Sequence, residues 1–178
     1  MNLPPPDWPD YFSLLLDLEG EAYEHDPRDP GGATKFGIDQ RSHPTVNIRN
    51  LTRQDAEKIY LAEYYRSAAH WLPQPLDYLY FDHAINAGET AAARILQQIL
   101  GVTIDGKVGP FTIGAIKNRL DRQPKNLPFL LRLYSENRIL FYQRLAYSKP
   151  RLACYLKGWL NRTRRAHTWA TAHLPEAA

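Results

Sequence analysis

The prolines and glycines of this 178-residue chain divide it into segments of helical length. Proline ends or kinks a helix because it lacks an amide hydrogen and clashes with the preceding turn. Between these breaks the apolar residues recur at helical spacing. This pattern predicts helices over residues 10–18, 52–69, 76–87, 90–100, 110–120, 129–146 and 151–172.

One short stretch between the first two helices has a different pattern. Residues 33–39 alternate Thr, Phe and Ile with polar residues, which predicts a small strand or hairpin. The sequence therefore predicts a mostly α, small α+β fold with six or seven helices and one short β-hairpin. The length favours a single domain over residues 1–178. Residues 1–9 are expected to form an extended leader, because three consecutive prolines cannot enter a helix interior.

The charges are unevenly distributed along the chain. Residues 1–109 contain 9 Lys/Arg and 16 Asp/Glu, whereas residues 110–178 contain 13 and 3. A basic region of this kind can bind a polyanion such as nucleic acid, anionic lipid or an anionic cell wall. Alternatively, the charged residues simply form the solvated faces of helices. Apolar runs are too short for a membrane helix, so membrane insertion is not expected.

Cysteine and histidine usage predicts neither a disulfide nor a metal site. The single cysteine, Cys154, excludes an internal disulfide, and we expect it to be a small buried apolar residue. The histidines lack ligand spacing, so no metal is expected and no cofactor is implied. The amino-terminus lacks the pattern of a secretory signal, which predicts synthesis in the cytoplasm as a soluble protein.

Glu19 is the strongest candidate for a catalytic group. The apolar residues of the first helix share one face, Glu19 lies at the edge of that face, and Asp17 and Glu21 lie further round the helix. A carboxyl group in this position is partly desolvated beside the negative end of the helix dipole, and both effects favour its neutral form. These conditions suit a general acid, although the same pattern fits one exposed acid in an acidic stretch.

A resemblance gives this candidate more weight. Glu19-Gly20, followed by Asp29-Pro30-Gly31-Gly32-x-Thr34-x-x-Gly37-Ile38, resembles the amino-terminal signature of glycoside hydrolase family 108, a family of phage-type and secretion-associated N-acetylmuramidases. The similarity covers about residues 19–162. It continues through Arg41-Ser42, Asn47-Ile48-Arg49, Phe81-Asp82-x-x-x-Asn86-x-Gly88, Leu96-Gln97-x-x-Leu100-Gly101-Val102 and Leu156-Lys157-Gly158-Trp159-Leu160-Asn161-Arg162. The segment Asp105-Gly106-x-x-Gly109-Pro110-x-Thr112 is similar to the family's carboxy-terminal peptidoglycan-binding module.

The resemblance implies a lysozyme-like fold that hydrolyses the bond between N-acetylmuramic acid and N-acetylglucosamine in bacterial peptidoglycan. It implies a catalytic lobe over about residues 10–90 and a helical, peptidoglycan-binding lobe over about 91–172. Glu19 would be the general acid, Asp29 would place or activate water, and Thr34 would hold that water. Since no secretory signal is visible, the resemblance suggests that the protein reaches the wall after holin-type release or dedicated secretion. We expect the protein to be a monomer.

Two features of the site stay open at this point. Glu21 and Ala22 separate Gly20 from Tyr23, unlike in the family pattern, so Glu21 competes with Glu19 for the catalytic position. Glu24, Asp26 and Asp82 are further acids that can reach the site, and either stereochemical outcome is compatible with the sequence. For sugar binding we expect the side chains of Tyr64, Asp82, Asn86 and Trp159.

Two other functions compete with the muramidase. A non-catalytic cell-wall-binding or adaptor protein would keep the fold without hydrolysis, and the joint presence of Glu19, Asp29 and Thr34 argues against it. A nucleic-acid-binding helical protein would explain Arg162, Arg164 and Arg165. That region lacks a reader motif and follows an acidic stretch, so no nucleic-acid partner is expected.

Overall fold

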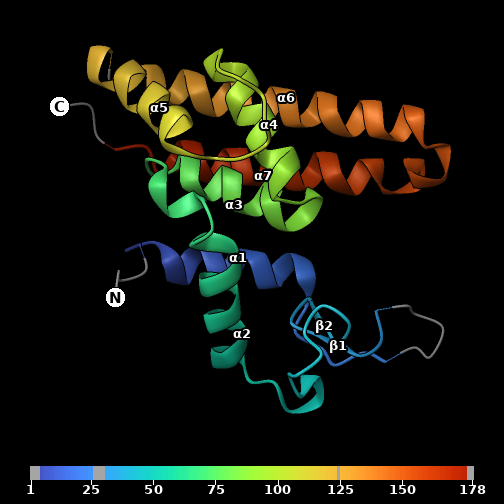
Figure 1. Cartoon of the computed structure of the whole chain (residues 1–178). Helices are drawn as coiled ribbons and strands as arrows, with labels where there is room; N and C mark the ends of the chain where they lie inside the picture. Colours follow the sequence, from blue (N-terminus) through green and yellow to red (C-terminus); the bar gives the residue numbers. More distant parts are fainter. Residues whose placement is uncertain (1–4, 26–30, 124, 176–178) are drawn as a thin grey trace. The chain divides into compact units, whose positions relative to one another are not determined.

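A computed structural model describes residues 5–25, 31–123 and 125–175 of the chain (Figure 1). Contacts group it into two compact units, Met1–Arg66 and Ser67–Ala178. The sequence predicts a single domain with two lobes dividing near residue 90, and this division stays a prediction. In the described part, seven α-helices and one two-stranded sheet form the fold.

The first unit is built on an aromatic contact between two helical segments. It contains α1 (Trp8–Glu19), β1 (Thr34–Lys35), β2 (Ile38–Asp39), η1 (Ile48–Asn50), α2 (Arg53–Ile59) and η2 (Tyr60–Tyr65). The buried face of α1 carries Trp8, which makes an edge contact with Tyr65 at 5.3 Å between ring centroids. The Trp8 indole N–H donates to Glu57 Oε1 at 2.9 Å, which fixes α1 against α2.

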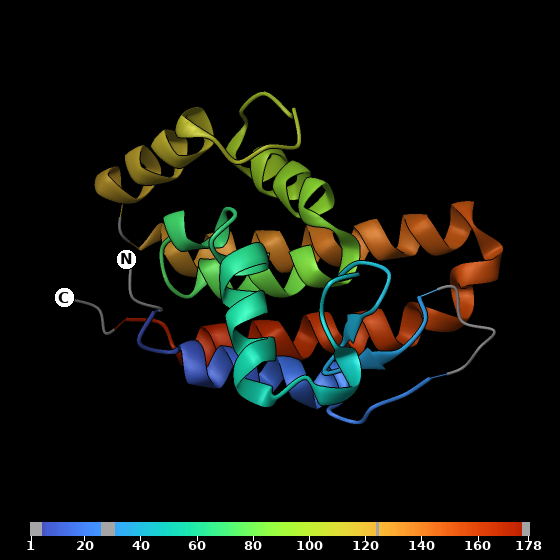
Figure 2. The same cartoon turned by 60° about the horizontal axis from the view of Figure 1, so that its bottom comes forward.

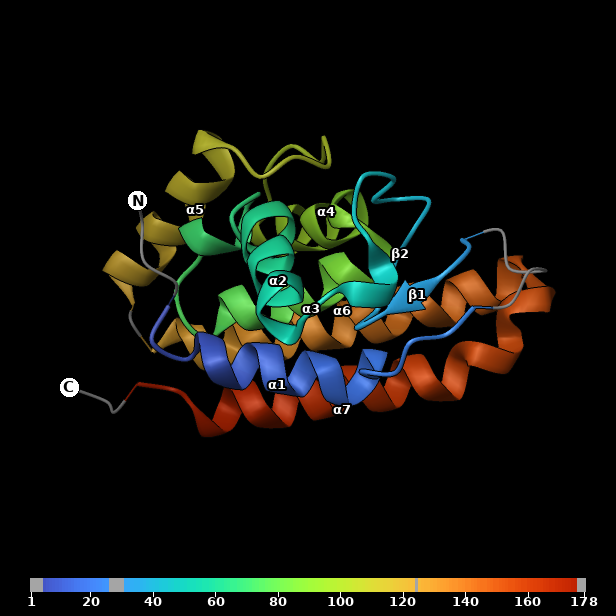
Figure 3. The same cartoon turned by 90° about the horizontal axis from the view of Figure 1, so that it is seen from below.

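Helix α1 begins two residues earlier than predicted. Trp8 and Pro9 belong to the helix rather than to an extended leader, because the first turn needs no amide hydrogen from proline. The helix ends at Glu19, and Gly20 follows with φ of +81° while its N–H donates to Leu16 O. The carboxy-terminal end of α1 lies beside the β1–β2 hairpin (Figure 3).

The helix predicted over residues 52–69 changes its winding within its length. Thr52 caps α2 by accepting from the Asp55 N–H, as the sequence indicates. From Tyr60 the chain winds as a π-helix to Tyr65, and the Arg66 N–H donates to Leu61 O, five residues back. Short π segments of this kind often occur at functional sites.

The second unit surrounds one central buried helix. It contains η3 (Ala69–Trp71), α3 (Leu76–Ala87), α4 (Glu89–Leu100), α5 (Pro110–Arg122), α6 (Asn126–Ser148), η4 (Pro150–Tyr155) and α7 (Leu156–Ala172). Every residue from Leu76 to Ala84 is buried, and α3 packs against α4, α6 and α7. The long helices α6 and α7 lie side by side, joined through η4 (Figure 2). Cys154, expected to be buried, lies exposed in η4.

Candidate active site

Glu19 occupies the place that its position on the helix predicts. As the last residue of α1 it is half-buried, whereas Glu21, two residues beyond the helix end, is exposed. Its neighbours Leu15 and Leu16 are buried. Among the two competing acids, Glu19 therefore has the more desolvated environment.

The turn of the β-hairpin lies directly against the Glu19 side chain. Phe36 and Gly37 form the two-residue turn with φ of +53° and +74°, the left-handed values of a type I′ hairpin turn. A β-carbon on residue 37 would lie 2.8 Å from Glu19 Cβ and 2.7 Å from the Tyr60 hydroxyl. The turn can therefore approach the acid only because residue 37 is a glycine.

Tyr60 holds this turn from the helical side. Its side chain is buried, and its hydroxyl donates to Phe36 O at 2.9 Å. Tyr60 is the first residue of the π-helix η2, so the irregular segment carries the group that fixes the turn. The acid, the turn and Tyr60 thus form one packed arrangement in the first unit.

Tyr64, expected to bind sugar, lies in the same neighbourhood. Its ring centroid is 5.4 Å from that of Tyr60, and the residue is half-buried. Burial raises the pKa of the Tyr64 phenol, and the negative charges of Glu63, Asp39 and Glu19 raise it further. The phenol stays protonated at neutral pH and lies in the field of both Glu19 and Asp39.

Three polar side chains share one face of the small sheet. Thr34 pairs with Asp39 across the hairpin, and it forms a bridge to Glu24 through two backbone hydrogen bonds of 2.8 Å. Directly paired residues of an antiparallel sheet project their side chains to the same face. Glu24, Thr34 and Asp39 therefore form a row across this face.

Asp39 is the member of this row that the sequence reasoning missed. Burial alone would raise the pKa of its carboxyl group, but hydrogen bonding from Ser42 and the charges of Arg41 and His43 lower it below its ordinary value. The Ser42 N–H donates to Asp39 Oδ1 at 2.9 Å. Position 39 follows Gly37-Ile38 in the hairpin, and this pairing with Thr34 is the signal that could have identified it.

Asp29, expected to place or activate water, lies outside the described residues, as does Asp26. The described remainder of the predicted turn supports the hairpin: Gly31 O accepts from the Arg41 N–H at 3.1 Å. Gly32 has φ of +77°, a conformation that favours glycine.

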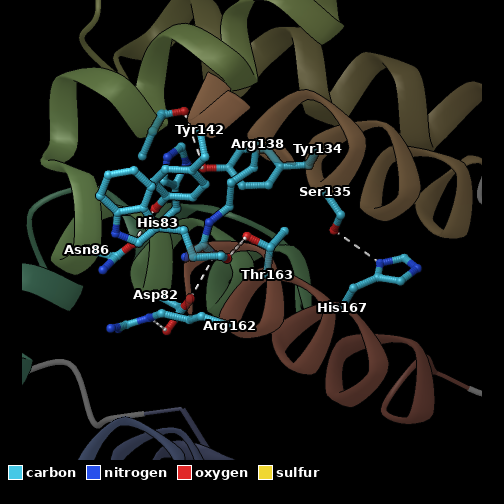
Figure 4. Close-up of polar contacts among 12 residues, drawn as sticks. Asp82, His83, Asn86, Tyr134, Ser135, Arg138, Tyr142, Arg162, Thr163 and His167 are labelled. Carbon is cyan, nitrogen blue, oxygen red and sulfur yellow. Dashed lines mark hydrogen bonds and ion pairs between the residues drawn. The ribbon is translucent and has the colours of Figure 1, made fainter. Parts of the chain in front are cut away.

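Asp82, expected to bind sugar, lies in a buried ion-pair cluster of the second unit (Figure 4). The residue is 2% exposed, Oδ2 accepts from Arg138 at 2.7 Å, and Oδ1 accepts from Arg162 at 2.9 Å. Burial alone would raise its pKa, but the two guanidinium charges outweigh burial and the pKa is lowered. Both carboxylate oxygens are engaged in joining α3, α6 and α7, which is a structural role rather than an open sugar contact.

His83 lies next to Asp82 and is also buried. Its Nδ1 is 3.0 Å from the Tyr134 hydroxyl, and the two rings meet edge to face. Burial holds the pKa of His83 well below its ordinary value, and the charges of Arg138 and Arg162 lower it further. The imidazole is therefore neutral at neutral pH and belongs to the core.

Asn86 and Trp159, the other expected sugar-binding residues, converge on Tyr142. The Tyr142 hydroxyl donates to Asn86 Oδ1 (Figure 4), and the Trp159 ring stacks on Tyr142 at 5.0 Å with an interplanar angle of 22°. Trp159 also approaches the exposed Tyr155, at 5.9 Å between centroids. Asn86 and Trp159 are both half-buried, so part of their surface stays accessible to solvent.

Two further properties concern the described residues as a whole. None of the described helices combines the length and the apolar character that crossing a membrane requires. The same part of the chain contains no cluster of three or more His, Cys, Asp or Glu side chains that could hold a metal ion.

Comparisons with known proteins identify the two parts of this sequence. Residues 12–88 match the family described as Glycosyl hydrolase 108, and residues 91–164 match the family described as a predicted peptidoglycan domain. The chain therefore combines a segment that is similar to the glycosyl hydrolase 108 family with a segment that is similar to a peptidoglycan domain. These matches support glycoside hydrolase activity on cell-wall peptidoglycan.

One solved structure gives the same assignment at the level of fold. The structure of SagA from Brucella abortus is similar with a TM-score of 0.71 and 28% sequence identity, over 93% of this chain and 92% of that one. A search of the curated proteins gives no match. The helices, the two-stranded hairpin and this similarity confirm the predicted mostly helical, lysozyme-like fold.

Proposed function

We propose that the chain is an N-acetylmuramidase, in which Glu19 is the general acid. It hydrolyses the glycosidic bond between N-acetylmuramic acid and N-acetylglucosamine. One observation carries this proposal: Glu19 is half-buried at the end of α1 and packs against the hairpin turn at Gly37, within the residues that match the hydrolase family. A partly desolvated carboxylic acid held by a rigid turn is what proton donation to a leaving group requires.

Hydrolysis adds a proton to one side of the broken bond and a hydroxyl group to the other. Glu19 donates its proton to the departing oxygen of N-acetylglucosamine, and water supplies a hydroxyl group to the anomeric carbon of N-acetylmuramic acid. A second carboxyl group serves such reactions as nucleophile or base. The resemblance assigns this role to Asp29, and it assigns to Thr34 the role of holding the water. Asp39 is a second candidate for the second carboxyl group, because it pairs with Thr34 across the hairpin.

Tyr64 provides a hydrogen-bond donor near the acid in this scheme. Burial and the nearby negative charges keep its phenol protonated, so it donates to a sugar oxygen rather than acting as a base. The sugar contacts expected of Asn86 and Trp159 stay predictions, whereas the position of Asp82 supports a structural role.

Analysis of reducing ends tests the proposed bond specificity. Purified protein is incubated with peptidoglycan sacculi, and the soluble products are reduced with borohydride and identified by mass spectrometry. The proposal predicts reduced N-acetylmuramic acid at the new ends. Reduced N-acetylglucosamine, or an anhydro product of a lytic transglycosylase, would contradict it, and binding to sacculi without any new reducing end would favour the wall-binding adaptor.

A further inference from the structure

A groove between α4 and α6 forms an open cavity in the second unit. Its volume is about 670 Å³, which is within the range of ligand-binding sites. The apolar residues that line it include Ala87, Ala91, Ile95, Phe141 and Leu145. Small alanine side chains on one wall leave space opposite Phe141, so the groove suits short alkyl groups better than a bulky ring.

Two arginines line the groove, one from each helix. Arg94 comes from α4 and Arg144 from α6, and the described lining residues include no Asp or Glu. Both arginines are exposed at their respective helix surfaces. The groove therefore combines an apolar floor with two positive charges that no lining carboxylate neutralises.

The loop after α4 helps to position Arg94. Gly106 has φ of +78°, and a β-carbon there would lie 3.3 Å from Arg94 Nε and 2.9 Å from Thr90 Cγ2. The Gly106 N–H donates at 2.8 Å to Oε1 of Gln97, whose side chain is buried. The loop is thus held against the Arg94 stem, which limits the rotamers that this side chain can adopt.

We propose that this groove binds the peptide stem of peptidoglycan. The stem is a short peptide with small alkyl side chains and several free carboxylates, so its methyl groups fit the apolar floor and its carboxylates pair with Arg94 and Arg144. Arginine binds carboxylates through two parallel hydrogen bonds. The inference rests on the proposed action on peptidoglycan, because α4 and α6 lie almost entirely within the peptidoglycan-domain match at residues 91–164.

Binding measurements with separate parts of the substrate test this assignment. The full-length chain carrying Glu19→Gln, which prevents turnover, is titrated with three ligands by calorimetry. These are the disaccharide tetrapeptide, the free tetrapeptide and the disaccharide without peptide. The free tetrapeptide should bind, and removing the peptide from the disaccharide should weaken binding measurably.

Substitution of each arginine locates the site. Arg94→Ala and Arg144→Ala should each weaken tetrapeptide binding by about tenfold or more, since each removes a hydrogen bond to a charged group. Arg132→Ala is the matched control, because it removes one exposed positive charge from α6 outside the groove. Its binding should stay within about twofold of the parent, well below the effect of one charged hydrogen bond.

Three results would overturn the inference: no binding of the free tetrapeptide, wild-type binding by both groove variants, or an equal loss in Arg132→Ala. Hydrolysis of sacculi by the unsubstituted chain is measured separately. Hydrolysis without tetrapeptide binding removes the groove assignment alone, whereas tetrapeptide binding without hydrolysis removes the proposed catalytic function alone.

Discussion

Replacing Gly37 by alanine perturbs the contact between the hairpin turn and the catalytic acid. The new methyl group would lie 2.8 Å from Glu19 Cβ, 3.1 Å from Glu19 Cγ and 2.7 Å from the Tyr60 hydroxyl. Carbon atoms that are not bonded prefer about 3.5–4.0 Å. The turn, the acid or Tyr60 must therefore move by several tenths of an ångström.

The expected loss of stability combines two effects. A left-handed conformation costs a residue with a side chain about 1–2 kcal/mol, and Gly37 has φ of +74°. Displacement of Tyr60 disrupts its hydrogen bond to Phe36 O, which contributes about 0.5–1.5 kcal/mol. Together the free energy of unfolding should fall by about 1.5–3.5 kcal/mol.

Gly101→Ala is the matched control for the backbone effect. Gly101 has φ of +69°, and a β-carbon there has none of the described heavy atoms within 4 Å. This variant should therefore lose only the conformational contribution, about 1–2 kcal/mol. The difference between the two variants measures the contact of the turn with Glu19 and Tyr60.

Urea unfolding and the rate of sacculus hydrolysis provide the two measurements. Gly37→Ala should hydrolyse sacculi about tenfold to a hundredfold more slowly, because small displacements of a catalytic group reduce rates by such factors. Gly101→Ala should retain most of its hydrolysis. If Gly37→Ala equals Gly101→Ala in both stability and rate, the turn does not position the acid.

Three further substitutions test the core of the second unit. Asp82→Asn should lower the unfolding free energy by about 3–5 kcal/mol at pH 7, because it leaves two buried guanidinium charges with a neutral partner. Because the pKa of Asp82 is lowered, its contribution to stability in the parent is present above about pH 4 and is lost as the pH falls further. Below about pH 6.5 the parent should lose up to about 1.4 kcal/mol of stability per pH unit, because the lowered pKa keeps His83 neutral in the folded state. His83→Gln should remove this pH-dependent loss. Gln97→Leu should cost about 1–3 kcal/mol by leaving the buried Gly106 N–H without its acceptor.

Urea unfolding across pH 3–8 checks all three substitutions. For Asp82→Asn, a decrease below 1 kcal/mol at pH 7 would contradict the role of the ion-pair cluster in stability. For His83→Gln, a pH dependence identical to that of the parent would show that folding does not lower the pKa of the imidazole. For Gln97→Leu, unchanged stability would show that the loop does not depend on this amide.

Much of the fold follows from local signals in the sequence. Proline and glycine exclude regular helix at defined positions, so the predicted helix over residues 76–87 coincides with α3. The position of Glu19 at the edge of an apolar face also follows from helical periodicity alone, and the residue is half-buried. Local chemistry of this kind depends only on neighbours within one or two turns.

The parts that could not be predicted depend on distant partners. Asp82 contacts Arg138 and Arg162, which lie 56 and 80 residues away along the chain. Its position on the helix alone therefore could not distinguish a buried ion pair from a sugar contact. The carbonyl of Phe36, a turn residue with positive φ, accepts from the Tyr60 hydroxyl, which is 24 residues away. The role of Gly37 follows from its proximity to Glu19 rather than from its own sequence context.

The rate of muropeptide release by Glu19→Gln, compared with Glu21→Gln, tests the central claim most directly. Both variants change one carboxyl group to an amide near the end of α1, but only position 19 packs against the hairpin turn. Loss of a general acid lowers a rate by about 10²–10⁴-fold. We predict such a loss for Glu19→Gln, with a native circular-dichroism spectrum, and a near-normal rate for Glu21→Gln. A normal rate for Glu19→Gln together with loss in Glu21→Gln would contradict the account.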